Sequence, residues 1–356
     1  MVGLKNSKNI RLIAFYLPQY HPIPENDRWW GKGFTEWANV KKAKPLFPGH
    51  YQPRLPADLG FYDLRLPEVR IKQAELARSH GIYGFCYYHY WFMGKRMLGR
   101  PLDEVLSSGK PDFPFCLCWA NENWTRRWSV GDKQVLMRQR YSGKDDKRHI
   151  RWLTRVFKDK RYIRIDGKPL LLVYRTSEMP NPLKTTLAWR GEAKKLGIGE
   201  IFLCRVESFD DLIHPAEVGF DASVDFPPHT LFFALDKRHS KRRPANRDRV
   251  VIDFRSAAWK MIDRAPPSHR WFPCVLAGFD NSPRRKSGPL ILHNLSPQKY
   301  ELQMRRAIKI VKRRKESDPV IFINAWNEWG EGNYLEPDQR FGLSYLKATR
   351  RALNEP

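Results

Sequence analysis

The chain alternates short apolar runs with longer stretches in which apolar and polar positions are mixed. Eight runs are rich in β-branched and aromatic residues and contain few charged positions; they span residues 12–17, 82–89, 113–120, 170–174, 201–206, 222–226, 272–278 and 320–325. A strand that is buried on both faces has this composition, which is typical of a parallel sheet. The pattern therefore predicts eight buried parallel strands.

The segments between the runs predict helices, most clearly at residues 66–80, 101–108, 144–157, 183–196 and 299–315. Pro67 lies near the start of the first helix, and Gly81 and Gly197 follow two of them, as expected at helix ends. Eight strands that alternate with helices predict an α/β fold, a (β/α)8 TIM barrel. The alternative is a doubly wound open sheet, but the count of eight and the lack of a glycine-rich first turn favour the barrel.

We expect one domain at residues 11–350, preceded by a tail at residues 1–10. Two stretches are too long for ordinary connections, at residues 19–62 and 232–249. The first follows the first strand, so we expect it to shape the substrate site. The second contains a dense run of basic residues at 237–243, which predicts either a solvated surface loop or a docking patch for an anion.

The charge balance narrows the choice of partners. Lys and Arg number 64 against 38 Asp and Glu, so the formal net charge is +26. Such an excess suggests an anionic partner, which is an acidic membrane surface, an anionic glycan or nucleic acid. Because the basic residues are spread through loops and helix ends, we expect no specific nucleic-acid site. The 13 Trp residues instead offer flat rings on which sugars stack.

The cysteines and the N-terminal residues indicate in which cellular compartment the protein is expected. Each of the five cysteines lies in an apolar run, so we expect buried reduced thiols rather than disulfides or metal ligands; they are Cys86, Cys116, Cys118, Cys204 and Cys274. No apolar run reaches the 18 residues of a membrane span, and residues 1–10 do not resemble a signal peptide. These features predict a cytoplasmic protein or one peripheral to the inner membrane.

Polar and aromatic residues follow every predicted strand, at the end of a barrel where active sites form. A carbohydrate requires several hydrogen-bond partners and stacking faces. We assign His21 and His89 as hydrogen-bonding wall residues, with proton transfer as the alternative. Glu122 is a sugar-hydroxyl acceptor or a structural ion pair. The candidate substrate-binding residues are Tyr16, Gln19, His21, Trp37, Tyr88, His89, Trp119, Asn121, Glu122, Trp124, Glu207, Asp225, Trp326, Asn327, Trp329 and Glu336.

The segment after the eighth strand carries the candidate catalytic residues, Glu328 and Glu331. In a continuing strand they would point to opposite faces, but Gly330 and Gly332 permit a sharp turn that brings both carboxyls to one site. Two carboxyls in one small space do not ionise equally, so one serves as acid and the other as base. Glycosidic bond cleavage requires such a pair. The alternative is that these glutamates cap a helix or pair with surplus arginines.

Four segments resemble one family in particular. They read AFYLPQYHPIPEND at residues 14–27, WWGKGFTEW at 29–37, HYQPRLP at 50–56 and WNEWGEG at 326–332. These segments resemble the WbsX-type family, whose members are glycosyltransferases of polysaccharide (O-antigen) gene clusters, and the resemblance extends over residues 10–345. The chain is also similar to glycoside hydrolase family 99, the endo-α-mannosidases with (β/α)8 barrels.

The second resemblance implies roles for the two glutamates. In family 99 the segment E-W-x-E carries both catalytic carboxyls, which correspond to Glu328 and Glu331. The first is the base for the sugar 2-hydroxyl, which forms a 1,2-anhydro intermediate, and the second is the acid and then activates water. This chemistry proceeds with retention and requires no metal or other cofactor. One position differs, because family 99 has His where this chain has Gly330.

The resemblance thus implies an enzyme acting on a glycosidic bond of a bacterial polysaccharide, such as an O-antigen or a mannan-like chain. The alternative is a glycosyltransferase of lipopolysaccharide biosynthesis. Paired glutamates on a barrel favour a hydrolase, whereas the basic surface and the expected compartment favour the transferase. A transglycosidase would satisfy both sets of observations.

Overall fold

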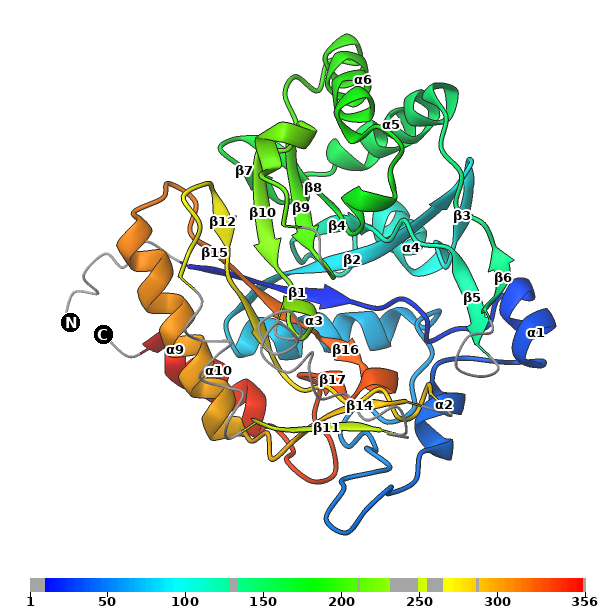
Figure 1. Cartoon of the computed structure of the whole chain (residues 1–356), viewed down its shortest axis with the longest axis vertical. Helices are drawn as coiled ribbons and strands as arrows, with labels where there is room; N and C mark the ends of the chain where they lie inside the picture. The colour runs from blue at the N-terminus through cyan, green and yellow to red at the C-terminus, as the bar shows by residue number, and fades with distance from the viewer. Residues whose placement is uncertain are drawn as a thin grey trace, which may run out of the picture.

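The computed structural model describes residues 10–127, 133–209, 212–230, 249–254, 265–285 and 288–354. Within them a parallel sheet curves around one core, with helices outside it (Figure 1). The strands that pair in this sheet are β1 Arg11–Tyr16, β2 Ile82–Phe92, β4 Phe115–Trp119, β8 Lys168–Val173, β9 Phe202–Glu207, β10 Ala222–Asp225, β12 Trp271–Phe272, β13 Cys274–Leu276 and β15 Val320–Asn324. All eight predicted apolar runs form these strands.

The seventh run closes the sheet into a barrel. Pro273 divides it into β12, which pairs with β10, and β13, which pairs with β15. β15 in turn pairs with β1, with Arg11 opposite Val320. Each strand therefore has a parallel neighbour on both sides, and the prediction of a (β/α)8 barrel is confirmed.

Helices follow most of the barrel strands, and the five predicted ones are present. They are α3 Pro67–Ser79, α4 Arg100–Ser108, α5 Gly143–Phe157, α6 Pro182–Lys195 and α9 Pro297–Arg314. A sixth helix, α10 Ser344–Asn354, follows the last strand and packs on α9. The fifth strand is followed only by a short 3-10 helix, η2 Pro215–Val218.

The shorter elements decorate the ends of the barrel. They are α1 Pro24–Trp30, α2 Trp37–Lys42, β3 Lys95–Met97, β5 Trp124–Arg127, β6 Lys133–Met137, β7 Arg164–Ile165, η1 Thr176–Glu178, β11 Val250–Asp253, β14 Leu290–His293, β16 Asn327–Glu328, η4 Trp329–Glu331 and β17 Asn333–Tyr334. The first insertion supplies α1 and α2. The basic second insertion lies outside the described residues except for Arg249, whose guanidinium donates to the Leu46 carbonyl at 2.6 Å.

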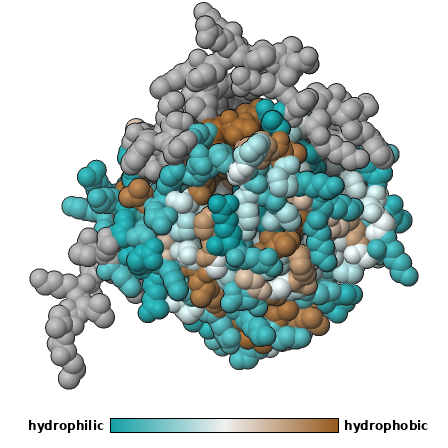
Figure 2. Space-filling view, turned by 90° about the horizontal axis from the view of Figure 1, so that it is seen from below, coloured by the Kyte–Doolittle hydropathy of each residue, from teal (hydrophilic) through white to brown (hydrophobic). Residues whose placement is uncertain are grey.

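Apolar side chains fill the barrel and the layer between the sheet and its helices. All five cysteines are free thiols; four are buried, as expected, whereas Cys274 is partly exposed. Most of the face in Figure 2 is hydrophilic, with apolar residues in separate patches. Among the described residues, no helix has both the length and the apolar character needed to cross a bilayer.

Candidate functional site

The eighth strand ends in a tight turn that carries both candidate catalytic glutamates. Glu328 ends β16, and Glu331 ends the 3-10 helix η4, in which residues three apart lie on one side. Gly332 follows with φ +56°, a conformation that suits glycine, and β17 then returns antiparallel to β16. Gly330 has an ordinary backbone conformation, so its role in this turn is not the one expected from the sequence.

Arg284 joins the two glutamates. Its guanidinium contacts Glu328 at 2.9 Å and Glu331 at 2.8 Å, and its Nε donates to Glu36 Oε1 at 2.6 Å. The Glu36 and Glu328 side chains are almost fully buried, whereas the Glu331 side chain is 32% exposed. The pair therefore presents one enclosed carboxyl and one that faces solvent.

Burial raises the pKa of Glu328 to about 8; Glu331 and Glu36 add to the rise, and Arg284 opposes it. Tyr88, within β2, lies close enough that the charge of Glu328 adds to the rise that burial causes in the pKa of the phenol. A carboxyl that titrates near neutrality can exchange protons with a substrate at physiological pH. Glu328 thus has the environment of an acid–base group.

A second ion pair, between Arg175 and Glu122, lies near Glu331. Arg175, after β8, contacts Glu122 at 2.7 Å, and Glu122 follows β4. Burial raises the pKa of Glu122, Arg175 opposes the rise, and Glu331 contributes to it. Asn121 fixes this corner, because it accepts from the Arg175 backbone N–H at 2.8 Å. The exits of the third, fourth and eighth strands thus meet around Glu331.

Behind the pair, a buried hydrogen-bond network holds the turn. Asn327 accepts from the Leu17 backbone N–H at 2.7 Å, and this contact fixes the turn to the first strand. Glu336 accepts hydrogen bonds from Trp329 Nε1 at 2.6 Å and from the Tyr62 hydroxyl at 2.8 Å. These candidates position the site from behind rather than line it.

The first insertion is attached to the same turn through Asp280, which follows the seventh strand. His50 Nε2 lies 2.8 Å from Asp280 Oδ2, and Gln52 donates to the same oxygen at 2.6 Å. The Asp280 backbone N–H donates to the carbonyl of Glu331 at 2.6 Å. The insertion is therefore fixed to the turn that carries Glu328 and Glu331. Among the described residues, no three His, Cys, Asp or Glu side chains are grouped as metal ligands.

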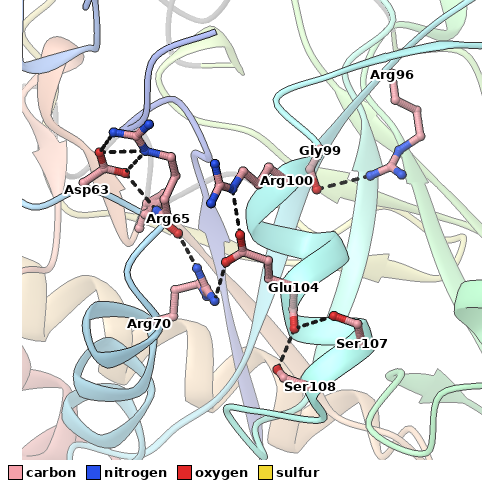
Figure 3. Close-up of polar contacts among 10 residues, drawn as sticks. Asp63, Arg65, Arg70, Arg96, Gly99, Arg100, Glu104, Ser107 and Ser108 are labelled. Carbon is pink, nitrogen blue, oxygen red and sulfur yellow. Dashed lines mark hydrogen bonds and ion pairs between the residues drawn. The ribbon is translucent and has the colours of Figure 1, made fainter.

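His21 lies away from the glutamate pair. It is buried near Asp63, Arg65 and Arg100, and burial lowers the pKa of the imidazole to about 4. These residues belong to a charged cluster between α3 and α4, where Arg65 and Arg70 approach Asp63 and Glu104 (Figure 3). The proposed site does not include His21.

His89 and Trp119 are buried between the sheet and the outer helices. His89 stacks on Trp152 and lies 3.0 Å from the imidazole of His149, and Trp119 packs on Trp189. Neither side chain faces the glutamate pair, so the proposed site excludes them. The proposed site also excludes Tyr16, Glu207 and Trp326, which contact Gln73, Ser223 and Phe85 respectively. Trp124 packs on Tyr90, and Asp225 is buried.

The sequence analysis missed Glu36 and Arg284. Glu36 precedes α2, and the Gln19 carbonyl accepts its backbone N–H at 3.1 Å; Trp37, next to it, packs on Trp329. Arg284 lies in an irregular loop after the seventh strand. Only the GFTEW segment gave a signal, since an acidic residue there is flanked by aromatics. The arginine could not be distinguished among 64 basic residues.

Solved structures similar to this chain support the barrel. The endo-α-mannosidase of glycoside hydrolase family 99 from Bacteroides thetaiotaomicron matches with a TM-score of 0.56 and 15% identity, covering 97% of this chain and 96% of that one. A protein described as glycoside hydrolase-like matches with a TM-score of 0.60 and 11% identity, over 99% of this chain and 96% of that one. At these identities the likeness concerns the fold.

Sequence comparison is more specific. A protein of Xanthomonas campestris pv. campestris, WxcX, is 44% identical over 355 residues, which are 99% of this chain and 51% of that protein. WxcX of another strain is 45% identical over 345 residues, 96% of this chain and 49% of that protein. This chain thus spans about half the length of these relatives. The family described as Glycosyltransferase WbsX matches residues 12–349, and the chain belongs to that family.

Proposed function

We propose that this carbohydrate-active enzyme acts on a glycosidic bond of a bacterial polysaccharide, with Glu328 and Glu331 as its two catalytic carboxyls. The observation that carries the proposal is the Arg284 contact to both glutamates, at 2.9 and 2.8 Å, at the carboxyl end of the eighth barrel strand. A pair made of one buried and one solvent-facing carboxyl, held side by side, has the components of an acid–base pair. Membership of a glycosyltransferase family and the fold shared with family 99 support a glycan as the substrate.

The proposed reaction proceeds in two steps with retention. In the first step Glu328 accepts the proton of the sugar 2-hydroxyl, whose oxygen bonds to C1 as the bond from C1 to the leaving oxygen breaks. Glu331 donates its proton to the leaving oxygen, and a 1,2-anhydro sugar results. In the second step Glu331 accepts a proton from water or from an acceptor hydroxyl, whose oxygen bonds to C1 as the bond from C1 to O2 breaks, and O2 takes its proton back from Glu328.

Transfer is the second candidate outcome, and the family supports it, since the family is described as glycosyltransferases. Hydrolysis and transfer share the first step in this mechanism. They differ only in whether water or a glycan hydroxyl occupies the pocket when the 1,2-anhydro sugar opens. A strongly basic protein is also suited to acidic membrane surfaces, where lipid-linked glycans are assembled.

The test is incubation of the chain with a panel of bacterial surface polysaccharides and sugar nucleotides, followed by mass spectrometry. Shortened glycans indicate a hydrolase, and an extended acceptor with consumed donor indicates a transferase. If neither glycans nor sugar nucleotides change under any condition at which the protein is folded, the proposal is wrong.

Substitutions then test the roles of the two glutamates. Glu331→Gln should abolish turnover of ordinary substrates, and a substrate with a very good leaving group should restore part of it, because protonation is then less important. Glu328→Gln should fail with every substrate that reacts through its 2-hydroxyl. Glu75→Gln, at an exposed position on α3, is the matched control and should leave turnover unchanged.

A further inference from the structure

We propose that Arg284, anchored by Glu36, is a positioning residue that orients Glu328 and Glu331 and favours the ionised form of Glu328. The inference rests on the proposed function in one respect, since it concerns the same two glutamates. It adds two residues, Glu36 and Arg284, that the sequence did not indicate.

The geometry assigns each edge of the guanidinium to one carboxyl. Nε donates to Glu36, while the two terminal nitrogens contact Glu328 and Glu331. A guanidinium is planar and rigid, so three partners at 2.6–2.9 Å fix both its position and its rotation. A lysine ammonium could supply the charge at this place but not the three fixed directions.

Glu36 is suited to the role of anchor. Its side chain is only 3% exposed, and it also accepts from Asn39 Nδ2 at 3.3 Å. It reaches the site from the first insertion, a part of the chain about 250 positions away from Arg284. A buried carboxylate at this position requires a cationic partner, and Arg284 provides it. Glu36 thus holds the guanidinium without itself belonging to the catalytic turn.

Gly330 provides the space for this arrangement. A Cβ atom on Gly330 would lie 1.8 Å from Glu36 Oε1 and 2.8 Å from Arg284 Nε. Any larger residue between Trp329 and Glu331 would therefore collide with the anchoring contact. Gly330 has an ordinary φ, so this position requires space and not a special backbone conformation. The lack of a side chain there lets Glu36 and Arg284 approach each other.

The charges around Glu328 give the two residues opposite effects. The groups that face Glu328 are Arg284 after the seventh strand, Glu36 and Tyr20 in the first insertion, Tyr88 and Tyr90 on β2, and Glu331 on η4. Burial is the largest influence and raises the pKa of Glu328; Arg284 lowers that pKa, whereas Glu36 raises it. Removing the arginine and removing the anchor should therefore move the titration of Glu328 in opposite directions.

If Arg284 were not held beside Glu328 in solution, the outcome would differ. Loss of Arg284 or of Glu36 would then leave the pKa of Glu328 unchanged. The measurement that separates these cases is the titration of Glu328 itself. It requires no turnover, so its result does not depend on whether the glycan substrate has been identified.

The experiment uses the full chain labelled with 13C at the glutamate side-chain carboxyls, with the signal of Glu328 assigned by its loss in Glu328→Gln. In Arg284→Gln we expect the pKa of Glu328 to rise by about one unit or more. In Glu36→Gln the amide oxygen can still accept from Arg284 Nε while the negative charge is lost, so we expect the pKa of Glu328 to fall. Arg284→Lys keeps the charge and should give a smaller change than Arg284→Gln. Arg65→Gln, in the charged cluster of Figure 3, is the control and should give none.

An unchanged pKa of Glu328 in Arg284→Gln, or a change of the same sign in the Gln variants at positions 36 and 284, would overturn the proposal. If Arg284→Gln does not fold, Arg284→Lys and Glu36→Gln still decide between the two cases. Once a glycan substrate is known, the acidic limb of the pH profile of kcat/KM should move in the same two directions. Opposite shifts in a protein that acts on no glycan would support the positioning role and contradict only the proposed reaction.

Discussion

Two buried carboxyls, Glu328 and Glu336, have a raised pKa, but their surroundings differ. Glu328 has a cation beside it, whereas Glu336 is held by neutral donors from Trp329, Tyr62 and Gln73. Burial raises the pKa of Glu336 to about 7, although these hydrogen bonds oppose the rise. Both carboxyls therefore gain a proton more readily in the folded state than in the unfolded chain.

This difference predicts how the stability of the fold depends on pH. Because the folded state binds the Glu336 proton more tightly than the unfolded chain, the stabilising contribution of Glu336 should be lost as the pH rises from about 4.5 to about 7, and Glu328 should extend the fall in stability to about pH 8. At about 1.4 kcal/mol per pKa unit, this contribution is about 3 kcal/mol. Glu336→Gln should remove that part of the pH dependence. Denaturant unfolding at a series of pH values measures it, and identical pH profiles for both proteins would contradict the assignment.

Gly330 makes a second residue-level prediction. Gly330→Ala should force Glu36 and Arg284 apart and lower the free energy of unfolding by about 2 kcal/mol, because the added methyl has no room. Gly191→Ala is the matched control, since that helical glycine has no neighbouring atom within 4 Å of a new Cβ and should be neutral or slightly stabilising. Equal unfolding midpoints in the two variants would show that the site around Gly330 is not tightly packed.

At the scale of elements, the regular parts of the fold were predictable and the irregular parts were not. The eight strands are readable because burial on both faces leaves a continuous apolar run, and α5 and α9 show apolar stripes. The 3-10 helix η4 and helix α2 are only three and six residues long, too short for a periodic pattern. The two glutamates could be located because they follow a strand. Their partners, Glu36 and Arg284, lie in irregular segments whose meeting depends on tertiary structure.

The link between the first insertion and the seventh strand gives an element-level prediction. Its contacts, chiefly those with His50 and Arg54, outweigh burial and lower the pKa of Asp280 to about 2. The stabilisation of the fold that comes from the ionised Asp280 is therefore present above the usual pKa of 3.8 and is lost as the pH falls through about 2. Asp280→Asn should lower the free energy of unfolding at neutral pH by about 2 kcal/mol.

The difference between wild type and Asp280→Asn should shrink below pH 4 as the carboxyl is protonated. Asp58→Asn, at an exposed position in the same insertion, is the control and should have no effect at any pH. A difference that stays constant down to pH 2 would mean that the aspartate acts through packing and not through its charge.

At the scale of the whole molecule, the charge is distributed unevenly. Among the described residues, the site gathers Glu36, Glu328, Glu331 and Glu122 around two arginines, Arg175 and Arg284, although the chain as a whole carries a net charge of +26. The excess positive charge therefore lies outside the site. Part of it forms an exposed stripe on α9, where the outward positions include Lys309, Lys312 and Arg313.

This distribution predicts salt-sensitive binding to acidic membranes. We expect the chain to sediment with phosphatidylglycerol vesicles at low salt, to be released as the salt concentration rises, and to ignore phosphatidylcholine vesicles. Reversal of charge at Lys309, Lys312 and Arg313 should weaken binding more than reversal at the exposed Lys72, Lys184 and Lys195. Equal losses would mean that only net charge matters, and tighter binding to random DNA than to the vesicles would favour a nucleic-acid partner.

The division of the seventh strand at Pro273 has a consequence for how the barrel opens. On one side only two residues of β12 pair with β10, and on the other only three residues of β13 pair with β15. Every other junction between neighbouring strands involves at least three paired residues, and most involve four or five. In amide hydrogen exchange we therefore expect deuterium to enter first along β12 and β10 and last along β1 and β2, so that transient separation of the cylinder starts beside the seventh strand.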